Sequence, residues 1–411
     1  MKIKSVSGIV LTLLLMDMLT LAFDVQPVNA SGTIHIRADG SVDPPTAGIM
    51  SADNFTYTLT SNIYEGINVE RDNIVVDGAG YFVQGYVVPE VGPYPFGIQL
   101  SGRSNITIKN MEIKAFGCGI YLSDSTNNNI FRNKITKNNN GVQFFGSSNN
   151  NIHENNITDT KLGIRFFHSS NNDIYRNNIA NNKQTGVGLS SSSNNGIREN
   201  DITNSCWAIF LDGSSNNSIS GNNLVSNDEG IYLERGSSDN CIHGNNVAEN
   251  NIFGICVASS PKNSIHENNI TNNGYDRYSI EGHRLDGYGL WLSYSSDNTI
   301  CHNNLVNNAL QVDSDGSVNT WDDGYPSGGN YWSDYNGTDA DGDGIGNTPY
   351  TIDENNQDNN PLMEPWNPSW SARVPVWTQW WFWRIVIAAI AASAVAVYFW
   401  KKRKKPTSTV S

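Results

Sequence analysis

Cysteine and basic residues are both scarce in this chain of 411 residues. The first scarcity limits the disulfides it can form, and the second limits its possible partners. The five cysteines form no CxxC motif and are scattered along the chain, as occasional core or surface substitutions would be. Because their number is odd, they cannot all pair with one another as internal disulfides. Acidic residues outnumber basic residues by 40 to 26, and the formal net charge of −14 disfavours nucleic acid as a partner.

Segments long enough for a helix are missing from the middle of the chain, because a short repeat fills it. An Ile that follows a polar, usually Asn-containing triplet recurs mostly every 22–24 residues, and in most copies an Asn stands three residues later. A fixed short period predicts a solenoid, in which each unit buries its apolar side only against its neighbours. The clearest anchors are Ile130, Ile152, Ile174, Ile197, Ile219, Ile242, Ile265 and Ile300, with Ile106 and Ile74 as weaker copies.

Each repeat contains three short alternating segments, such as GIYL, NIF and KIT, separated by Asn, Ser and Gly. Alternation with period 2 is typical of strands, and the separating residues are turn formers. A leucine-rich repeat has a similar period but needs a regular leucine frame and a longer segment. We therefore predict an all-β protein, a right-handed parallel β-helix of about nine to ten coils, since parallel crossovers are nearly always right-handed.

Equivalent residues of a β-helix form ladders, because its coils stack about 4.8 Å apart. The anchor Ile residues, the apolar residues five positions later, and pairs such as Ile120 and Leu122 are expected to point inward. The Asn three residues after each anchor is expected to form a ladder of stacked amides at a corner. Its members are Asn133, Asn155, Asn177, Asn200, Asn222, Asn245, Asn268 and Asn303.

Both ends of the chain have the patterns of an exported protein anchored in a membrane. Lys2 and Lys4 precede an apolar run and a small-residue cleavage site at 28–30, which predicts a secretory signal; an uncleaved anchor is the alternative. The apolar stretch 385–400 has aromatic residues at its edges and five basic residues after it. This pattern predicts one transmembrane helix with the β-helix outside and the C-terminus in the cytoplasm, a buried core helix being the alternative.

The predicted organisation follows from these features. It comprises a signal peptide (1–30), an N-terminal cap (31–72), the β-helix repeats (73–312), a C-terminal cap with an acidic calcium-type loop (313–366), a linker (367–380), a transmembrane helix (381–400) and a basic cytoplasmic tail (401–411).

The N-N-x-I-x-x-N-x-I units resemble the NosD-type group of β-helix repeats, which is also described as the carbohydrate-binding and sugar-hydrolase class. The resemblance covers residues 74–362, and the segment GGNYWSDYNGTDADGDGIGNTPYTIDENNQDNNPL is similar to one found in exported archaeal proteins of this kind. It implies the β-helix fold and an archaeal surface protein, but such coils host lyases, hydrolases, epimerases and non-enzymes alike. The bacterial namesake is implicated in assembling the copper centre of nitrous oxide reductase. No residue motif carries that role to this chain, so copper is not expected.

An acidic loop near the C-terminus is the strongest candidate metal site. Alternate oxygen donors with a glycine at the sixth position are typical of calcium loops. The expected ligands are Asp339, Asp341, Asp343, the backbone carbonyl of Ile345, and Asn347. Tyr350 stands at the twelfth position, where a bidentate Glu is usual, and Asp353 or Asp358 could replace it from outside the standard spacing. We expect a structural calcium ion; an acidic surface turn is the alternative.

Outward positions of the repeat supply the candidate binding residues. The aromatic residues Tyr121, Phe210, Tyr232 and Trp291 fall on the outward side of the G-I-x-L strands, and flat aromatic rings stack on sugars, so they could form a glycan-binding row. The histidines His153, His243 and His266 share the outward position after the anchor Ile, where copper or zinc could bind. That position also holds unrelated residues, which favours a permissive surface position.

Catalytic candidates are weaker. Asp212 and Glu234 occupy equivalent positions one coil apart, near the roughly 5 Å separation of retaining glycosidases; a solvated acidic face is the alternative. The insertion before Ile300 carries Glu281 and His283, which either serve a site or belong to a capping loop. We predict a surface protein that binds polysaccharide or another glycan without turnover. The alternatives are a polysaccharide lyase, hydrolase or epimerase, and a copper-processing accessory protein.

Overall fold

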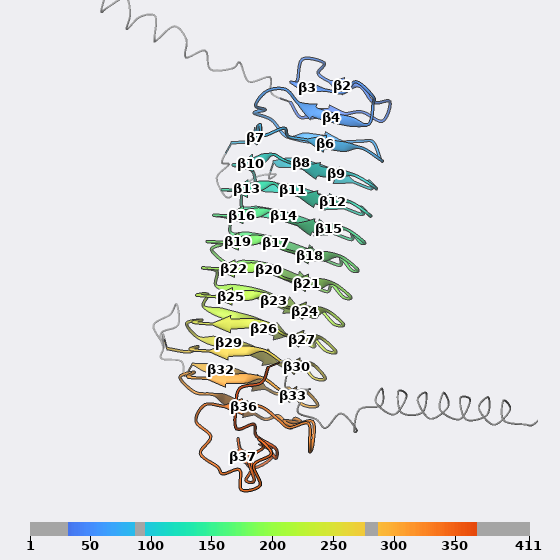
Figure 1. Cartoon of the computed structure of the whole chain (residues 1–411). Coiled ribbons are helices and arrows are strands. Elements are labelled where there is room, and N and C mark those ends of the chain that lie inside the picture. The colour runs from blue at the N-terminus through green and yellow to red at the C-terminus, as the bar shows by residue number, and fades with distance from the viewer. Residues whose placement is uncertain (1–31, 87–94, 276–286, 368–411) are drawn as a thin grey trace, which may run out of the picture.

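The computed structural model describes residues 32–86, 95–275 and 287–367, and within these ranges the chain is all-β. Its strands stack into one long column (Figure 1). The predicted signal peptide, transmembrane helix and cytoplasmic tail lie outside these ranges, as does nearly all of the predicted linker. Among the described residues, no helix is long and apolar enough to cross a membrane.

Three sheets run along the column and are called sheets A, B and C here. Sheet A consists, in stacking order, of β2 (Val42–Asp43), β1 (Ile34–Ile36), β5 (Ile67–Val69), β8 (Phe96–Ser101), β11 (Cys118–Ser123), β14 (Asn140–Phe145), β17 (Leu162–Phe167), β20 (Thr185–Ser190), β23 (Trp207–Asp212), β26 (Glu229–Glu234), β29 (Phe253–Ala258), β32 (Tyr288–Ser293) and β35 (Val312–Asp315). Sheet B consists of β3 (Ile49–Met50), β4 (Thr56–Leu59), β6 (Val75–Asp77), β9 (Thr107–Lys109), β12 (Asn129–Phe131), β15 (Asn151–His153), β18 (Asp173–Tyr175), β21 (Gly196–Arg198), β24 (Ser218–Ser220), β27 (Cys241–His243), β30 (Ser264–His266) and β33 (Thr299–Cys301). Sheet C consists of β7 (Phe82–Gln84), β10 (Glu112–Lys114), β13 (Lys134–Thr136), β16 (Asn156–Thr158), β19 (Asn178–Ala180), β22 (Asp201–Thr203), β25 (Asn223–Val225), β28 (Asn246–Ala248), β31 (Asn269–Thr271), β34 (Asn304–Val306) and β36 (Tyr331–Trp332). A two-stranded sheet of β37 (Tyr350–Thr351) and β38 (Gln357–Asp358) lies near the C-terminal end.

Each regular coil contributes one strand to each sheet: β11, β12 and β13 form one coil, and β14, β15 and β16 form the next. Neighbouring coils pair in parallel and in register, so that Ile120 lies beside Val142 in sheet A and Ile130 beside Ile152 in sheet B. In-register stacking turns each position of the repeat into a column of side chains. The predicted parallel β-solenoid is confirmed.

The number of turns exceeds the prediction. The eleven strands of sheet C correspond to about eleven turns, not nine to ten. The difference arises at the N-terminal end, where β1 and β5 already pair in parallel although these segments lack the Asn-rich repeat. Tyr57 and Ile67 are buried there and fill the core that the repeat residues fill elsewhere. The described part of the predicted N-terminal cap, from residue 32 to 72, thus contributes strands to the column.

The core is a narrow column of aliphatic side chains. The anchor Ile residues, the apolar residues five positions later and the Ile120/Leu122 pair are all fully buried, as predicted. Their hydrophobic burial holds each coil only to the coils above and below it. At the C-terminal end Trp321 and Trp332 join this core and cover its last coils.

The predicted Asn ladder is present and satisfies the backbone of a corner. The backbone N–H and Nδ2 of Asn200 both donate to Oδ1 of Asn222 at 3.0 Å, and Nδ2 of Asn222 donates to the carbonyl of Ile197 at 2.8 Å. Further ladders, which the sequence analysis did not predict, follow other corners. They consist of Asn128, Asn150, Asn172, Asn195, Asn217, Asn240, Asn263 and Asn298; of Asn227, Asn250, Asn273 and Asn308; and of Ser125, Ser147, Ser169, Ser192, Ser214, Ser237, Ser260 and Ser295.

Candidate functional site

The outer face of sheet A carries the four aromatic residues singled out from the sequence. Tyr121, Phe210, Tyr232 and Trp291 are each the fourth residue of a six-residue strand, between two buried neighbours, and each is partly exposed. Phe210 and Tyr232 lie on adjacent strands with ring centroids 5.6 Å apart. Tyr121 and Trp291 belong to strands further along the sheet in opposite directions, so the structure brings together only the central pair.

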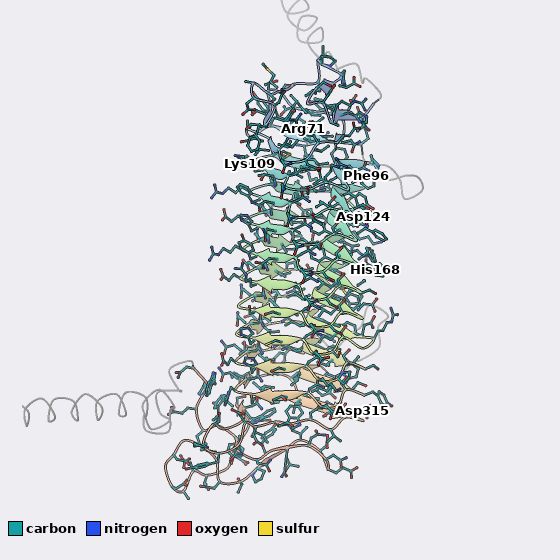
Figure 2. All side chains as sticks on the ribbon, turned by 90° about the vertical axis from the view of Figure 1, so that its right-hand side faces the viewer. Arg71, Phe96, Lys109, Asp124, His168 and Asp315 are labelled. Carbon is teal, nitrogen blue, oxygen red and sulfur yellow. The ribbon has the colours of Figure 1, made fainter. Side chains whose placement is uncertain are left out.

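A second column of aromatic residues on this face was missed by the sequence analysis. Trp207 is the first residue of its strand, and strict alternation would turn it inward with Ile209 and Leu211. Its ring instead stacks on Phe210 with the centroids 5.1 Å apart. The other two pairs stack across neighbouring strands: Phe96 of β8 on Tyr121 of β11 at 4.5 Å, and Phe253 of β29 on Trp291 of β32 at 5.2 Å. Figure 2 labels Phe96, which lies toward the N-terminal end of this face.

Inward and outward side chains do not alternate strictly along the six-residue strands of sheet A. The second and third residues of each strand are both buried, so the residue before them faces outward. The second residue is almost always glycine, because the next coil passes very close. A Cβ added to Gly119 would lie 2.6 Å from the carbonyl oxygen of Gly141, a distance that real side chains do not reach. A column of glycines, interrupted by Ala208, is the sequence signal that could have revealed the change of phase.

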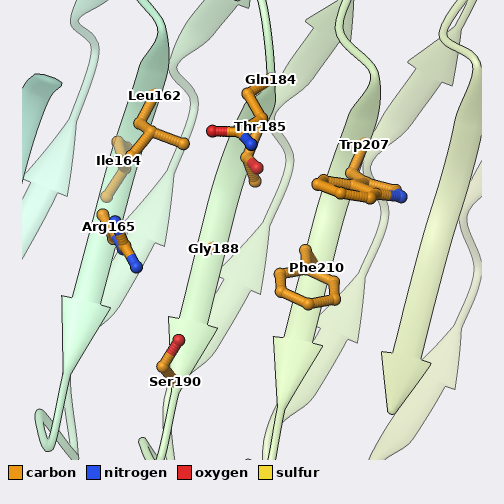
Figure 3. Close-up of a pocket in the computed structure, with 9 residues that line it drawn as sticks. All are labelled: Leu162, Ile164, Arg165, Gln184, Thr185, Gly188, Ser190, Trp207 and Phe210. Atoms are coloured by element: carbon orange, nitrogen blue, oxygen red, sulfur yellow. The ribbon is translucent and has the colours of Figure 1, made fainter. Parts of the chain in front are cut away.

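A pocket of about 100 Å³ opens on the outer face of sheet A (Figure 3). The fourth residues of successive strands form a column of side chains on this face, and Gly188 leaves a gap in that column because it has no side chain. Gly188 lies between Arg165 of β17 and Phe210 of β23, which are its partners in register. Trp207 and Phe210 line one side of the pocket and Arg165 lines the other, with Gln184 at the rim. The pocket thus combines a flat apolar wall with a cation.

Arg165 supplies the positive charge of this pocket. Its guanidinium lies 4.0 Å from the centre of the Phe167 ring, which holds the side chain along the sheet. Partial burial lowers the pKa of Arg165, but an arginine remains charged at any physiological pH. Among the ion pairs of the described residues, none involves Arg165. Its N–H donors therefore have no carboxylate partner from these residues.

Beside the aromatic wall lies a carboxyl group in an unusual environment. Glu229 pairs in register with Trp207, and within the described structure both Oε2 of Glu229 and the indole N–H of Trp207 are buried without a hydrogen-bond partner. Burial raises the pKa of Glu229 to about 7; the nearby indole N–H favours the charged form but does not offset burial. A carboxyl group that is partly protonated at neutral pH can donate a hydrogen bond or a proton.

The two carboxylates proposed as a catalytic pair are neighbours, as expected. Asp212 and Glu234 are partners in register on β23 and β26. Arg235 contacts both: its Nη1 lies 3.3 Å from Asp212 and its Nε 3.6 Å from Glu234. Two carboxylates that share one arginine are typical of a surface ion-pair network. The other catalytic candidates, Glu281 and His283, lie outside the described residues.

The outer face of sheet B carries the predicted histidine position. The rings of His243 and His266 are parallel, with centroids 5.1 Å apart. The structure adds two thiols that the sequence analysis did not connect with them: Sγ of Cys241 lies 3.5 Å from Nε2 of His266, and Cys301 is the in-register partner of His266 on the next strand. Burial lowers the pKa of His266 and raises the pKa of the Cys241 thiol.

His153 occupies the same position of the repeat as His266, but its neighbour is an amide and not a thiol. Its ring stacks between Phe131 and Tyr175, at 5.0 Å and 4.7 Å, and its Nε2 lies 2.9 Å from Oδ1 of Asn129. In both cases a histidine ring leans over the first residue of the preceding strand in sheet B. Only at His266 is that residue a cysteine.

The acidic loop of the C-terminal cap brings three carboxylates close together. Donor atoms of Asp339, Asp341 and Asp343 lie within 4.8 Å of one another, the only such group of three among the described residues. The Asp339 carboxylate also accepts backbone N–H groups of the loop at 2.6–3.2 Å: those of Gly342, Asp343 and Gly344. These donor oxygens fit a hard cation such as calcium.

Two residues that the sequence places near this loop have partners elsewhere in the cap. Tyr350, at the twelfth position, directs its hydroxyl to the Asp334 carboxylate at 3.2 Å. Asp358, considered as a substitute ligand, is instead buried and accepts hydrogen bonds from Asn330 and Trp332. That part of the expectation is wrong, because Asp358 is used to close the core.

A family model described as periplasmic copper-binding protein (NosD) matches residues 31–186, 73–252 and 183–337, which together span most of the described chain. No curated protein matches the chain in sequence.

Solved β-helix structures resemble it only distantly. The Dettilon tailspike protein is 14% identical with a TM-score of 0.45, over 65% of this chain and 59% of its own. The periplasmic alginate epimerase AlgG is 18% identical with a TM-score of 0.44, over 70% and 82%. DFA-IIIase from Arthrobacter chlorophenolicus A6 is 12% identical with a TM-score of 0.41, over 66% and 63%. The chain therefore spans less than two thirds of the tailspike protein and of DFA-IIIase.

Proposed function

The chain belongs to the NosD family of repeat proteins, and we propose that it is an exported protein that binds acidic polysaccharide on the outer face of sheet A. The family description names the periplasm, and residues 1–30 have the pattern of a secretory signal; both support export. The apolar segment 381–400 would then anchor the protein in the membrane.

The observation that carries the proposal is the pocket at Gly188, with aromatic rings on one side and an arginine on the other. Trp207 and Phe210 offer a flat apolar wall, against which the apolar face of a sugar ring can stack. Because Gly188 has no side chain, a ring can approach the sheet there more closely than at Gln143 or Tyr232 in the same column.

Arg165 favours a sugar that carries a carboxylate. A guanidinium binds carboxylates through two parallel hydrogen bonds, and these charge-assisted bonds are stronger than those to neutral hydroxyls. Since Arg165 has no ion-pair partner among the described residues, a ligand carboxylate would not have to displace one of them. A neutral polysaccharide would use the aromatic wall but not this charge.

The test compares an acidic and a neutral polysaccharide. The full chain should bind polygalacturonate and should bind dextran more weakly, as measured by affinity electrophoresis or calorimetry. Trp207→Ala should weaken binding by up to about tenfold, since one stacking contact contributes roughly 0.5–1.5 kcal/mol. Phe131→Ala, an aromatic deletion on sheet B, is the matched control and should leave binding unchanged. Binding that survives Trp207→Ala, or that is lost equally in Phe131→Ala, would contradict the assignment.

A second candidate function is cleavage or epimerisation of the same polysaccharide. The observation that favours it is Glu229, whose raised pKa of about 7 suits a general acid or base next to the aromatic wall. If the protein is an enzyme, prolonged incubation with polygalacturonate should release reducing ends or unsaturated sugars. Glu229→Gln should then abolish release while binding persists. If no product forms, the protein is a binding module.

We also propose that a calcium ion stabilises the C-terminal cap at Asp339, Asp341 and Asp343. The three converging carboxylates and the backbone bonds that hold Asp339 support this role. The family description names copper as well, and its reduced ion prefers thiolate and imidazole donors. Such donors meet on sheet B only as one pair, Cys241 and His266, and no third His, Cys, Asp or Glu donor of the described residues converges on them, so the residues present do not form a copper site there.

A further inference from the structure

We propose that the pocket at Gly188 takes a short sugar substituent that carries a carboxylate and a methyl group on one carbon. Pyruvic acid joined to a sugar as a cyclic acetal has this structure, and so does lactic acid joined as an ether. The proposal rests on the proposed function, because it concerns the same pocket on sheet A. It narrows the ligand from acidic polysaccharides in general to those that carry such a substituent.

The pocket is too small for a whole sugar ring. Its volume is about 100 Å³. A protein cavity of about 150 Å³ takes up one benzene molecule, which has six carbon atoms, so this pocket has room for about four non-hydrogen atoms. A pyranose is larger than benzene, because it carries several oxygen atoms outside its ring, and it therefore stays against the outer face of the sheet. A carboxylate and a methyl group together are small enough to enter.

Methyl groups line the buried part of the pocket. Leu162 and Thr185 contribute to its wall and are nearly fully buried. Where a side chain at Gly188 would begin, the nearest atom across the pocket is the methyl carbon of Thr185, at 3.3 Å. The polar residues Gln184 and Ser190 line the pocket from the residue before β20 and from its last residue. The hydroxyl groups of a sugar ring would find few partners on the methyl-lined surface, whereas a methyl group gains by leaving water there.

The charged side and the aromatic side of the pocket suit the two groups of the substituent. Arg165 can contact the carboxylate while Trp207 contacts the methyl group, because the two side chains lie on opposite sides of the pocket (Figure 3). The guanidinium is held along the sheet by the Phe167 ring, whose centre is 4.0 Å away. In a uronic acid the carboxylate is bonded to the sugar ring itself, so no methyl group accompanies it. In a pyruvic acetal or a lactic acid ether the two groups project from the sugar and enter together.

Xanthan provides a matched pair of ligands, because mild acid removes its pyruvic acetals and leaves its glucuronic acid in place. The full chain should bind pyruvylated xanthan at least about tenfold more tightly than depyruvylated xanthan in affinity electrophoresis. The reason is that removal of the acetal deletes both a charge-assisted contact and a buried methyl group. Depyruvylated xanthan and polygalacturonate should still bind, more weakly, through their uronic acids.

Arg165→Gln should bind the two forms of xanthan with affinities that differ by less than about threefold, since the charge that distinguishes them is gone. Arg132→Gln is the matched control. Arg132 follows β12 of sheet B and its side chain is 64% exposed, so this variant should keep the preference of the wild type.

Small competitors identify the substituent and need only the wild type, so they also serve if Arg165→Gln does not fold. A methyl galactoside with a pyruvic acetal and N-acetylmuramic acid, which carries a lactic acid ether, are each added against pyruvylated xanthan. The one that displaces the polymer at the lower concentration identifies the substituent. N-acetylglucosamine lacks the lactic acid and should displace nothing.

Equal affinity of the wild type for the two forms of xanthan would overturn the substituent assignment and leave the proposed function intact. The same holds if folded Arg165→Gln keeps the preference, if Arg132→Gln loses it, or if neither acidic competitor displaces the polymer better than N-acetylglucosamine. Failure of the wild type to bind any of the acidic polysaccharides would overturn the proposed function itself, and the substituent assignment with it.

Discussion

The Asp358 carboxylate accepts the backbone N–H of Asn330 at 2.7 Å and so ends the Asn ladder of the solenoid. Asn330 is itself the acceptor for the N–H of Asn303, the last predicted member of that ladder. The same Asp358 oxygen accepts the indole N–H of Trp332 at 2.9 Å, which fixes a core residue of the cap. One buried carboxylate thus joins the repeat to its C-terminal cover.

Burial raises the pKa of Asp358 to about 6, from an ordinary value of 3.8. Below about pH 3 the group is protonated in both the folded and the unfolded chain, and its titration has no effect on stability. As the pH rises toward 6, the unfolded chain ionises first, so the folded state loses stability by up to about 3 kcal/mol and then levels off.

Asp358→Asn keeps an acceptor oxygen but cannot ionise. The variant should therefore lose less stability than the wild type between pH 4 and pH 7, as measured by urea unfolding at several pH values. Two parallel stability curves would contradict the assigned pKa shift.

Removal of one amide from the ladder should destabilise the whole column. Asn222→Leu deprives the N–H and Nδ2 groups of Asn200 and the carbonyl of Ile197 of their partner, and leaving a buried polar group unsatisfied costs about 1–3 kcal/mol. The denaturant midpoint should fall clearly. Asn223→Leu changes the neighbouring exposed residue and should shift stability by less than about 0.5 kcal/mol. Equal midpoints for the two variants would refute the structural role of the ladder.

Gly188→Leu should block the pocket and so weaken binding of the polysaccharide. Gly188 does not have a positive φ, and a Cβ there would meet only Thr185 at 3.3 Å, so Gly188→Leu should fold. The leucine would occupy the space beside Trp207 and Phe210, and polygalacturonate binding should drop at least about tenfold. Gln143→Leu places the same side chain in the same column outside the pocket and should bind normally. Unchanged binding by Gly188→Leu would remove the pocket from the proposed function.

Binding of an acidic polysaccharide should weaken as Glu229 ionises. Because the pKa of Glu229 is raised to about 7, the group is mostly neutral at pH 5 and mostly charged at pH 8. A charged Glu229 would repel a ligand carboxylate near Trp207, so affinity should be higher at pH 5. Glu229→Gln should flatten this dependence and bind at pH 8 as the wild type does at pH 5. A wild-type affinity that rises with pH would show that Glu229 does not face the ligand.

Calcium should raise the melting temperature of the full chain. An ion that binds only the folded state stabilises it by about 2.7 kcal/mol at 100 times its Kd. Asp341→Ala removes one of the three converging carboxylates and should abolish the difference between calcium and chelator. Glu354→Ala deletes an exposed carboxylate of the same cap and should preserve it. Identical wild-type melts with calcium and with chelator would exclude a calcium role.

Much of the fold could be predicted because the repeat is local information. Ile130 and the anchors that follow it recur with a fixed period, and that period alone predicts which side chains enter the core and which amides stack. The first turns escaped prediction for the same reason: around Ile36 and Ile67 the chain stacks in parallel without the repeat pattern.

The candidate sites depended on information that the repeat does not contain. Trp207 faces outward only because the backbone changes phase at Ala208, where the neighbouring coils pass too close for a large side chain. The pocket exists because Gly188 stands between Arg165 and Phe210 in the stack, and a gap in a column has no counterpart in a single repeat.

The sequence by itself therefore determined the solenoid, its core and its predicted Asn ladder, since each follows from residues within one period. Tertiary structure alone decided which side chains become neighbours across coils. Cys241 and His266 are distant in the chain, and their 3.5 Å contact arises because β27 and β30 pair in register and the imidazole leans back over the preceding strand. The repeat period determines whether a side chain points into the core or outward. Which groups that side chain contacts on the next coil depends on how the coils stack and on its rotamer.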